Sequence, residues 1–252
     1  MATSNTNKEL AGKVALITGG ARNIGAATSL ALADAGCAVA INTRASREDG
    51  DAIVKQIRDG GGQAELYLAD IADGKAARAM VDAVIARFGK VDILVLNASV
   101  RKETPFLETS FEEWRSIMGI SHDGSFHLAQ ACIPSMLKAG GGSIVTVGGL
   151  NSLAGTKSVH GSVAKHGMVG MTRALAHEFA AKNIRVNCVA PGQMNTIRAA
   201  HRSPRSDPKS KIPMQRMGEA REIADTIRFL CGPGASYITG QTVHVNGGAM
   251  MF

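Results

Sequence analysis

A short glycine-containing turn near the start of the chain has the residue types that hold a dinucleotide phosphate. Residues 19–25 read Gly-Gly-Ala-Arg-Asn-Ile-Gly and follow the apolar, β-branched segment 13–18. An alanine-rich helical segment comes next and reaches Ala35. Glycine lets the backbone approach a pyrophosphate, and a helix N-terminus offers unpaired N–H groups to it. A turn of this composition between a strand and a helix therefore predicts dinucleotide binding.

Two arginines suit the extra phosphate of NADP. The residue just after the second strand of such a fold contacts the adenosine ribose, where an acid suits NAD and a base suits the 2′-phosphate. The sequence has Arg44 there, Arg22 lies in the glycine turn, and no acid follows Arg44 before Glu48. We expect both guanidinium groups to grip the 2′-phosphate and to favour NADP(H) over NAD(H). The alternative for either arginine is a solvated surface residue.

The elements that must position these residues alternate along the chain. Strands are expected at residues 13–18, 38–41, 64–68, 91–96, 143–147, 184–190 and 242–245. Long helices are expected at about 111–137 and 160–181. The alternation predicts an α/β, three-layer Rossmann fold with a doubly wound parallel sheet of about seven strands and helices on both faces. Ligands bind beyond the carboxyl ends of such strands, so residues 19–25 and Asn97 with Ala98 should line one crevice.

Length and composition favour one domain. The 252 residues contain no repeat, linker or composition break, so we expect a single dinucleotide-binding domain over residues 1–252. Residues 193–217 form the one long irregular segment and are expected to be a mobile basic substrate loop. Its charged and histidine residues are Arg198, His201, Arg202, Arg205, Asp207, Lys209, Lys211 and Arg216. This excess of basic residues suits an anionic substrate, or else a merely solvated loop.

Charge and cysteine usage exclude several other classes. The formal charge is +7, but the sequence has no Lys/Arg block and no aromatic residues interleaved with basic ones. A nucleic-acid-binding surface is therefore not indicated. The four cysteines are far apart and lack metal-ligand spacing, so we expect buried free thiols, no metal site and a reducing compartment. No apolar run suits a signal peptide or a membrane span, which favours a cytoplasmic location away from membranes.

Several motifs in order resemble the short-chain dehydrogenase/reductase family, in particular its 3-oxoacyl-ACP-reductase-like members. Residues 18–25 resemble the family motif TGxxxGIG, with Asn23 at the middle glycine; residues 70–71 resemble its adenine-contacting Asp-Val, residues 96–99 its NNAG, residues 191–196 its PGxxxT, and residues 246–248 its DGG. The resemblance implies cofactor contacts from Gly19, Arg22, Asn23, Ile24, Gly25, Arg44, Asp70, Ile71, Asn97, Ala98, Lys165, Pro191, Gly192 and Thr196. It also implies a homotetramer joined through the two long helices and the C-terminal strand region.

The catalytic positions that the resemblance implies are mostly changed. Family enzymes move a hydride between the nicotinamide and a carbonyl or alcohol carbon, using a Tyr, a Lys four residues later, a Ser thirteen residues before the Tyr, and an Asn. Lys165 matches the Lys, whereas Gly161 stands at the Tyr position, Gly148 or Gly149 at the Ser position and Ser121 at the Asn position. Glycine has no proton to give and no donor for an oxyanion, so the ordinary mechanism cannot operate unchanged.

His160 is the main candidate for the missing proton donor. It precedes the vacant Tyr position, and its imidazole could serve as acid or base with Lys165 lowering its pKa. One helical step is about 100°, so the backbone would have to adjust, and a structural histidine is the equal alternative. The other polar candidates, each with a solvated or capping role as the alternative, are Ser121, His122, Asp123, Asn151, Ser152 and Ser162.

Three functions remain open from the sequence. The first is an NADP(H)-dependent oxidoreductase on a small carbonyl or hydroxyl substrate, with a non-standard catalytic site in which Lys165, His160 and Ser121 are the candidate residues. The second is a non-redox enzyme of lyase or decarboxylase type on the same fold. The third is a catalytically silent protein that binds NADP(H).

Overall fold

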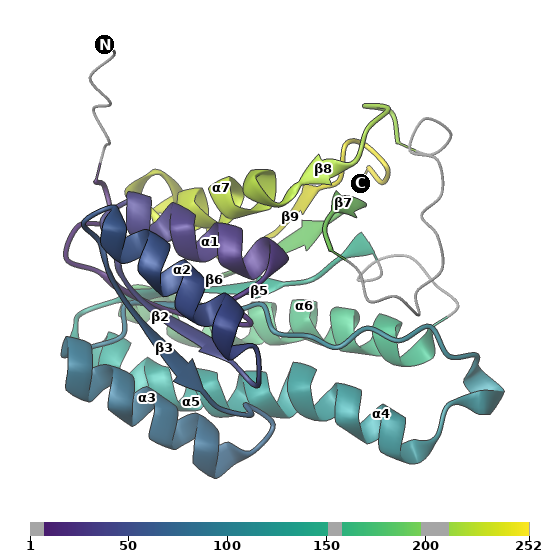
Figure 1. Cartoon of the computed structure of the whole chain (residues 1–252). Coiled ribbons are helices and arrows are strands. Elements are labelled where there is room, and N and C mark those ends of the chain that lie inside the picture. The colour runs from purple at the N-terminus through teal and green to yellow at the C-terminus, as the bar shows by residue number, and fades with distance from the viewer. Residues whose placement is uncertain (1–7, 151–157, 198–211, 252) are drawn as a thin grey trace.

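A computed structural model describes residues 8–150, 158–197 and 212–251 of the chain. A seven-stranded parallel sheet in the order β3-β2-β1-β4-β5-β6-β9 forms its centre (Figure 1). The strands are β1 Val14–Thr18, β2 Ala38–Thr43, β3 Gln63–Leu68, β4 Ile93–Leu96, β5 Gly142–Val147, β6 Ile184–Pro191 and β9 Thr242–Val245. The helices are α1 Asn23–Asp34, α2 Arg47–Asp59, α3 Gly74–Phe88, α4 Phe111–Met118, α5 Gly124–Lys138, α6 Val159–Phe179 and α7 Ala220–Cys231. The expected doubly wound parallel sheet is confirmed.

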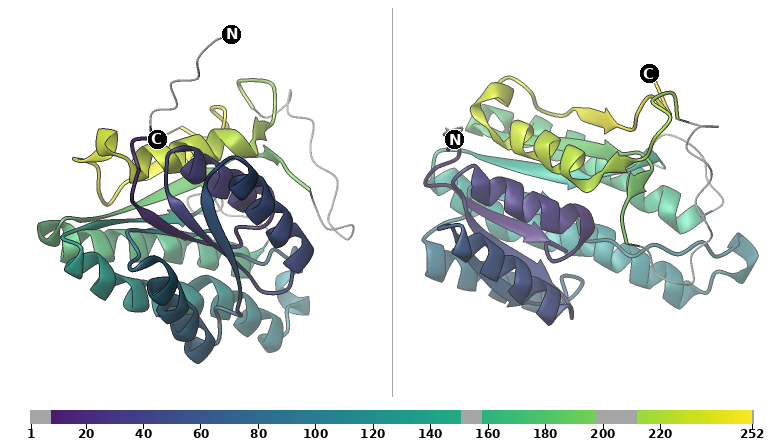
Figure 2. Two further views of the ribbon diagram at one scale, coloured as in Figure 1. Left: turned by 60° about the vertical axis from the view of Figure 1, so that its left-hand side comes forward. Right: turned by 45° about the horizontal axis from the view of Figure 1, so that its top comes forward.

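Helices cover both faces of the sheet, as the turned views in Figure 2 show. On one face α1 packs over β1 and β2, α2 over β2 and β3, and α7 over β5 and β6, through apolar residues that include Leu32, Ile57, Ile223 and Ile227. On the other face lie α3, α5 and α6, with α3 packed against α5, α5 over β4 and β5, and α6 over β5 and β6. All five residues of β1 are buried, since a central parallel strand has helices on both sides. The sheet is therefore a rigid platform for the loops at its carboxyl end.

Two segments differ from the sequence expectation. The single helix expected at 111–137 is divided into α4 and α5 by the π-helical segment Gly119–Asp123. The segment expected to be irregular contains β7 Met194–Asn195, which pairs in parallel with β8 Gly218–Glu219. Residues 198–211 lie outside the described residues, and with them six of the basic residues expected in a substrate loop. The seventh, Arg216, makes two bonds of 2.8 and 2.7 Å to the Glu222 carboxylate.

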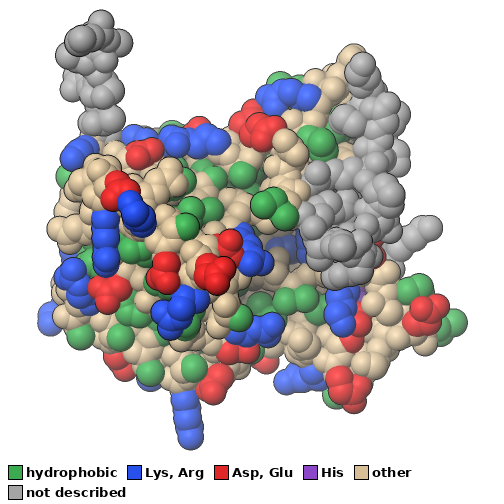
Figure 3. All heavy atoms as spheres, in the orientation of Figure 1, with side chains coloured by type: hydrophobic (Ala, Val, Ile, Leu, Met, Phe, Trp, Pro, Cys, Tyr) green, Lys and Arg blue, Asp and Glu red, His purple; other side chains and the backbone are tan. Residues whose placement is uncertain are grey.

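Surface charge, helix hydropathy and the cysteines can be compared with the classes of protein considered from the sequence. On the face shown in Figure 3, Lys and Arg side chains are interspersed with Asp and Glu instead of forming one basic patch. Within the described ranges, no helix combines the length and the hydropathy needed to cross a bilayer. Cys37, Cys132, Cys188 and Cys231 are buried free thiols.

Candidate active site

A cavity of about 510 Å³ opens at the carboxyl ends of the central strands. Its lining residues are Gly19, Arg22, Asn23, Ile24, Gly25, Asn97, Ala98, Ser99, Arg101, Val147, Gly148, Lys165, Pro191, Gly192, Gln193, Met194, Thr196 and Ile197. Most of the predicted cofactor residues thus surround one space, although they come from distant parts of the sequence. The predicted residues outside this lining are Arg44, Asp70, Ile71, Ser121 and His160.

The glycine turn can only be built from glycine at its two ends. Gly19 has a φ of +60°, which side-chain-bearing residues rarely adopt. A Cβ on Gly25 would overlap the Gly19 carbonyl oxygen. The first intrahelical bond of α1 runs from Ala26 N to Arg22 O, so the N–H groups of residues 23–25 have no intrahelical partner. This cradle of amides at a helix N-terminus fits a pyrophosphate.

Thr18 fastens the turn to the end of β4. Its hydroxyl donates to Val95 O and accepts from the backbone N–H groups of Asn97 and Ala98, both at 3.0 Å. The Asn97 amide donates in turn to Thr18 O at 2.9 Å and to Gly19 O at 3.2 Å. Asn97 therefore holds the glycine turn in shape by bonding to its backbone.

Asn23, which replaces a glycine of the family motif, bridges the cavity mouth. Its φ is +51°, a left-handed value that asparagine tolerates better than most residues. Its side-chain amide donates to Ile197 O at 3.2 Å, and its Oδ1 accepts from Ile197 N at 2.9 Å. The side chain thus joins the glycine turn to the segment after β7.

Both arginines proposed for the 2′-phosphate are paired with acids. Arg22 Nε donates to Asp49 at 2.5 Å, and Arg44 lies 3.8 Å from Asp70. From the sequence we expected no acid before Glu48 to compete with the phosphate for these arginines. Asp49 and Asp70 come later in the sequence, but the fold places them beside Arg22 and Arg44. All four side chains are largely exposed, and exposed ion pairs contribute only about 0–1 kcal/mol. A doubly charged phosphate would compete well for either guanidinium.

Asp70 and Ile71 serve the fold in ways that the sequence did not show. Asp70 accepts a bond from Ala72 N at 3.0 Å, which tightens the turn after β3. The Ile71 side chain is 5% exposed and packs in the core beside Gly124. Neither residue borders the cavity.

Lys165 presents an amine to the cavity from α6. Its Nζ donates to Val147 O, the last residue of β5, at 2.8 Å. Burial lowers the pKa of the Lys165 ammonium to about 8, with a further lowering contribution from the positive charge of Arg101. An amine that titrates in this range can both donate and accept a proton near neutral pH.

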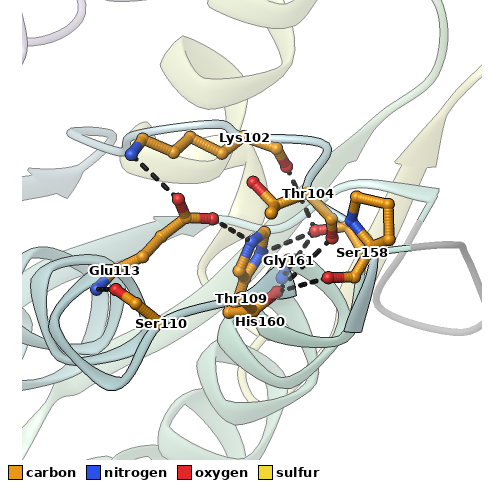
Figure 4. A network of polar contacts seen from close by, with 9 residues as sticks. Lys102, Thr104, Thr109, Ser110, Glu113, Ser158, His160 and Gly161 are labelled. Carbon is orange, nitrogen blue, oxygen red and sulfur yellow. Dashed lines mark hydrogen bonds and ion pairs between the residues drawn. The ribbon is translucent and has the colours of Figure 1, made fainter. Parts of the chain in front are cut away.

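His160 lies in a separate network, shown in Figure 4, and not in the cavity lining. The ring is fully buried; Nε2 donates to Glu113 Oε1 at 3.0 Å, and Nδ1 lies 2.6 Å from Ser158 Oγ. Ser158 caps α6 by accepting from Gly161 N, and it also contacts Lys102 O. Because both ring nitrogens are engaged here, the arrangement does not support His160 as the proton donor. Its place in the fold is to tie α4 to the start of α6.

Glu113 carries the charge of this network. Hydrogen bonds from Thr104 and from Lys102 hold the pKa of its carboxyl down to about 2, against an ordinary value of 4.5. A depressed carboxyl pKa stabilises the folded state above pH 4.5, and this contribution is lost as the pH falls towards 2.

Replacing Glu113 should therefore cost stability in a pH-dependent way. Glu113→Gln removes charge-assisted bonds, so we expect a loss of about 1–3 kcal/mol in the free energy of unfolding at pH 7. The loss should shrink as the pH falls below 4.5. Urea unfolding followed by circular dichroism measures it, with the exposed Glu178→Gln as control. Equal stability of the Glu113 variant and wild type at pH 7 would contradict the assignment.

Comparisons with known proteins identify the family of this chain. The family profile described as Enoyl-(Acyl carrier protein) reductase matches residues 19–250. A 3-oxoacyl-[acyl-carrier-protein] reductase FabG from Staphylococcus epidermidis is 35% identical over 242 residues, which are 95% of this chain and 99% of that protein. The chain belongs to the short-chain dehydrogenase/reductase family. It is thereby an NAD(P)-dependent oxidoreductase by class.

Two similar solved structures carry a cofactor. A short chain dehydrogenase from Burkholderia cenocepacia J2315, in complex with NADP, is 31% identical with a TM-score of 0.90, over 96% of this chain and 99% of that one. A blue fluorescent protein from a metagenomic library, in complex with NADPH, is 33% identical with a TM-score of 0.91, over 96% and 100%.

Only some of the catalytic positions that the family motif assigns lie at the cavity of this short-chain dehydrogenase/reductase. Gly148 lines the cavity, and Gly149 faces Arg101. Gly161 lies in the first turn of α6, where its N–H bonds to the capping Ser158. Ser121 is buried within the π-helical segment, outside the cavity lining.

The π-helical segment packs against α6, the helix that carries Lys165. His122 Nε2 lies 3.1 Å from Ala164 O, and a Cβ on Gly167 would overlap the same ring. Among the described residues, two further polar candidates lie outside the cavity lining: Asp123 lies 3.8 Å from Arg115, and the Ser162 carbonyl contacts His166. Asn151 and Ser152 lie outside the described residues.

Sequence reasoning missed Arg101. This residue lies in the loop after β4 and lines the cavity with Lys165. Its position four residues after Asn97 was a usable signal, because that loop starts at the carboxyl end of a central strand.

Proposed function

We propose that this chain is an NADP(H)-dependent oxidoreductase that interconverts a carbonyl and an alcohol, with Lys165 as the proton-transferring group of a non-standard catalytic site. The observation that carries the proposal is the shared cavity: the Lys165 amine and the glycine turn border the same space. A titratable amine beside a dinucleotide cradle has the two parts that such a reaction needs.

The cradle supports NADP(H) as the cofactor. Unpaired amides at the start of α1 suit the pyrophosphate, and Arg22 and Arg44 suit the 2′-phosphate once it displaces Asp49 and Asp70. The two ligand-bearing relatives hold NADP and NADPH. When bound, NADP(H) supplies or accepts the hydride.

The protein residues then control position and protons. The Val147 carbonyl holds the Lys165 amine at the end of β5. Because the pKa of Lys165 is about 8, most of the amine is protonated at pH 7 and can donate to a carbonyl oxygen during reduction. Alcohol oxidation needs the neutral amine and is favoured at higher pH.

We also propose a class of substrate, a location and a domain organisation for this chain. A 3-oxoacyl carbonyl is a suitable probe, because the relatives are named 3-oxoacyl-[acyl-carrier-protein] reductases. The free thiols support a cytoplasmic location. We also propose a single domain, with residues 193–217 as its substrate loop.

The direct test is a binding and turnover assay. NADPH and NADH are titrated by cofactor fluorescence, and NADPH oxidation is then followed with acetoacetyl-CoA and ethyl acetoacetate. The proposal predicts tight NADPH binding and carbonyl-dependent oxidation. Binding without any oxidation would favour a silent NADP(H)-binding protein, and consumption of the carbonyl compound without NADPH would favour a non-redox enzyme.

The arginine assignment makes a separate prediction. Arg44→Gln should weaken NADPH binding about 10-fold or more while NADH binding changes little, because only NADPH carries the 2′-phosphate. Fluorescence titration of both cofactors gives the ratio of dissociation constants. Arg78→Gln on α3 is the control, and an unchanged NADPH/NADH ratio in the Arg44 variant would remove this residue from the proposal.

The proposed homotetramer also has a direct check. Phe126 on α5 and Val163 on α6 are exposed, and β9 is an edge strand of the sheet. Exposed apolar residues and an open edge both suit subunit contacts. Sedimentation equilibrium should give the mass of four chains, and the mass of one chain would refute the assembly.

A further inference from the structure

The cavity wall around Lys165 is basic. Among the described residues that line it, Arg22, Arg101 and Lys165 are basic and none is Asp or Glu. Arg22 belongs to the glycine turn, whereas Arg101 follows β4 and its charge acts on the Lys165 amine. Two positive groups that interact across a cavity repel each other, and an anion bound beside them offsets that repulsion.

Two glycines at the end of β5 lie beside the cavity and close to Arg101. A Cβ on Gly149 would meet Arg101 Nη2 at 3.7 Å, an ordinary van der Waals contact. Gly148 borders the same cavity and also has no side chain. Neither glycine therefore places a side chain of its own against the guanidinium.

We propose that Arg101 binds a carboxylate of the substrate, so that the enzyme acts on small oxo acids and the corresponding hydroxy acids. This inference rests on the proposed function. A planar guanidinium matches a carboxylate through two parallel hydrogen bonds. The carbonyl of a 2-oxo or 3-oxo acid is only one or two carbons from its carboxylate, which suits two cationic side chains that line one cavity.

The reaction balances with these residues. In the reduction, the carbonyl carbon gains a hydride from NADPH and the carbonyl oxygen gains a proton from the Lys165 ammonium. The products are the hydroxy acid, NADP⁺ and a neutral amine, which water reprotonates. Arg101 keeps its charge throughout and acts by binding and orienting the substrate.

The test compares acetoacetate with its neutral methyl ester, which have the same carbonyl. We expect wild-type kcat/KM to be about 10–100-fold higher for acetoacetate. Arg101→Gln should remove that preference, because kcat/KM for acetoacetate should fall about 10–100-fold more than kcat/KM for the methyl ester at the same pH, while Arg101→Lys should restore part of it. Arg115→Gln on α4 is the matched control. Equal use of both compounds by wild type, or equal loss for both in Arg101→Gln, would overturn the inference.

A second readout does not depend on turnover. Acetylation of Lys165 by acetic anhydride is measured by mass spectrometry from about pH 6 to 10, with NADP⁺ present and with or without malonate. Malonate should move the midpoint of reactivity upward in wild type but not in Arg101→Gln, because a bound carboxylate stabilises the ammonium. No effect of malonate on wild type would overturn the carboxylate site. If malonate acts but no carbonyl is reduced, the proposed function fails while this site stands.

Discussion

Lys165→Met should lower the rate of carbonyl reduction by about 10²–10⁴-fold, the usual contribution of a positioned acid or base. The methionine side chain has a similar length but carries no proton, so the cavity keeps its shape and loses only the amine. NADPH should still bind, because the glycine turn is untouched. Stopped-flow measurement of NADPH oxidation under saturating cofactor gives the rate.

The pH dependence separates a proton donor from a merely electrostatic group. Wild-type reduction should be fast below pH 8 and fall above it, because the Lys165 ammonium has a pKa of about 8 and only the ammonium donates. Alcohol oxidation should show the opposite dependence. Lys165→Arg keeps the positive charge but cannot release a proton in this range, so it should remain slow. Lys138→Met on α5 is the control, and an Arg variant with wild-type activity would contradict the proton role.

Gly25→Ala should weaken NADPH binding about 10–100-fold, the usual cost of forcing a methyl group into a filled space. The new Cβ would overlap the Gly19 carbonyl oxygen and force the turn open, which displaces the amides at the start of α1. Fluorescence titration measures the change in the dissociation constant for NADPH.

A matched glycine controls for general effects of the substitution. A Cβ added to Gly170 on α6 would have nothing within 4 Å, and this residue lies outside the cavity lining, so Gly170→Ala should bind NADPH like wild type. Circular dichroism of both variants verifies that they fold. Unchanged NADPH affinity in a folded Gly25→Ala protein would show that the turn does not hold the cofactor.

The sheet and the cofactor cradle could be predicted because local sequence determines them. Short β-branched runs between helical segments leave few arrangements other than a parallel sheet. Once the sheet is parallel, the carboxyl ends of its strands lie together, which places residues 19–25, Asn97 and Lys165 around one cavity. Gly25 was readable for the same reason, since a strand, a tight turn and a helix follow one another directly.

The partners of individual side chains could not be read from the sequence. His160 stands next to Gly161 in the chain, yet the orientation of α6 turns its ring towards Glu113, which is 47 residues away. Arg22 meets Asp49 only because α2 folds back beside the glycine turn. Contacts of this kind depend on how helices pack, and no local pattern encodes them.

The π-helical segment at Gly119–Asp123 was hidden for a related reason. Its sequence continues the helical spacing on both sides, so a single helix was the natural expectation for 111–137. The extra residue in this turn is stabilised by contacts with α6, where His122 meets Ala164. A tertiary contact thus decides a local backbone feature that often marks functional sites.

The measurement that tests the central claim most directly is transfer of an isotope from the cofactor. The protein is incubated with NADPH that carries deuterium in the transferable position at C4, together with acetoacetate, methyl acetoacetate or acetoacetyl-CoA, and the products are analysed by mass spectrometry. Our account predicts a hydroxy product from at least one of these carbonyl compounds, with one deuterium on the carbon that carries the new hydroxyl. Recovery of bound, unreacted NADPH with no labelled product from any of the three, or product formed without NADPH, would contradict it.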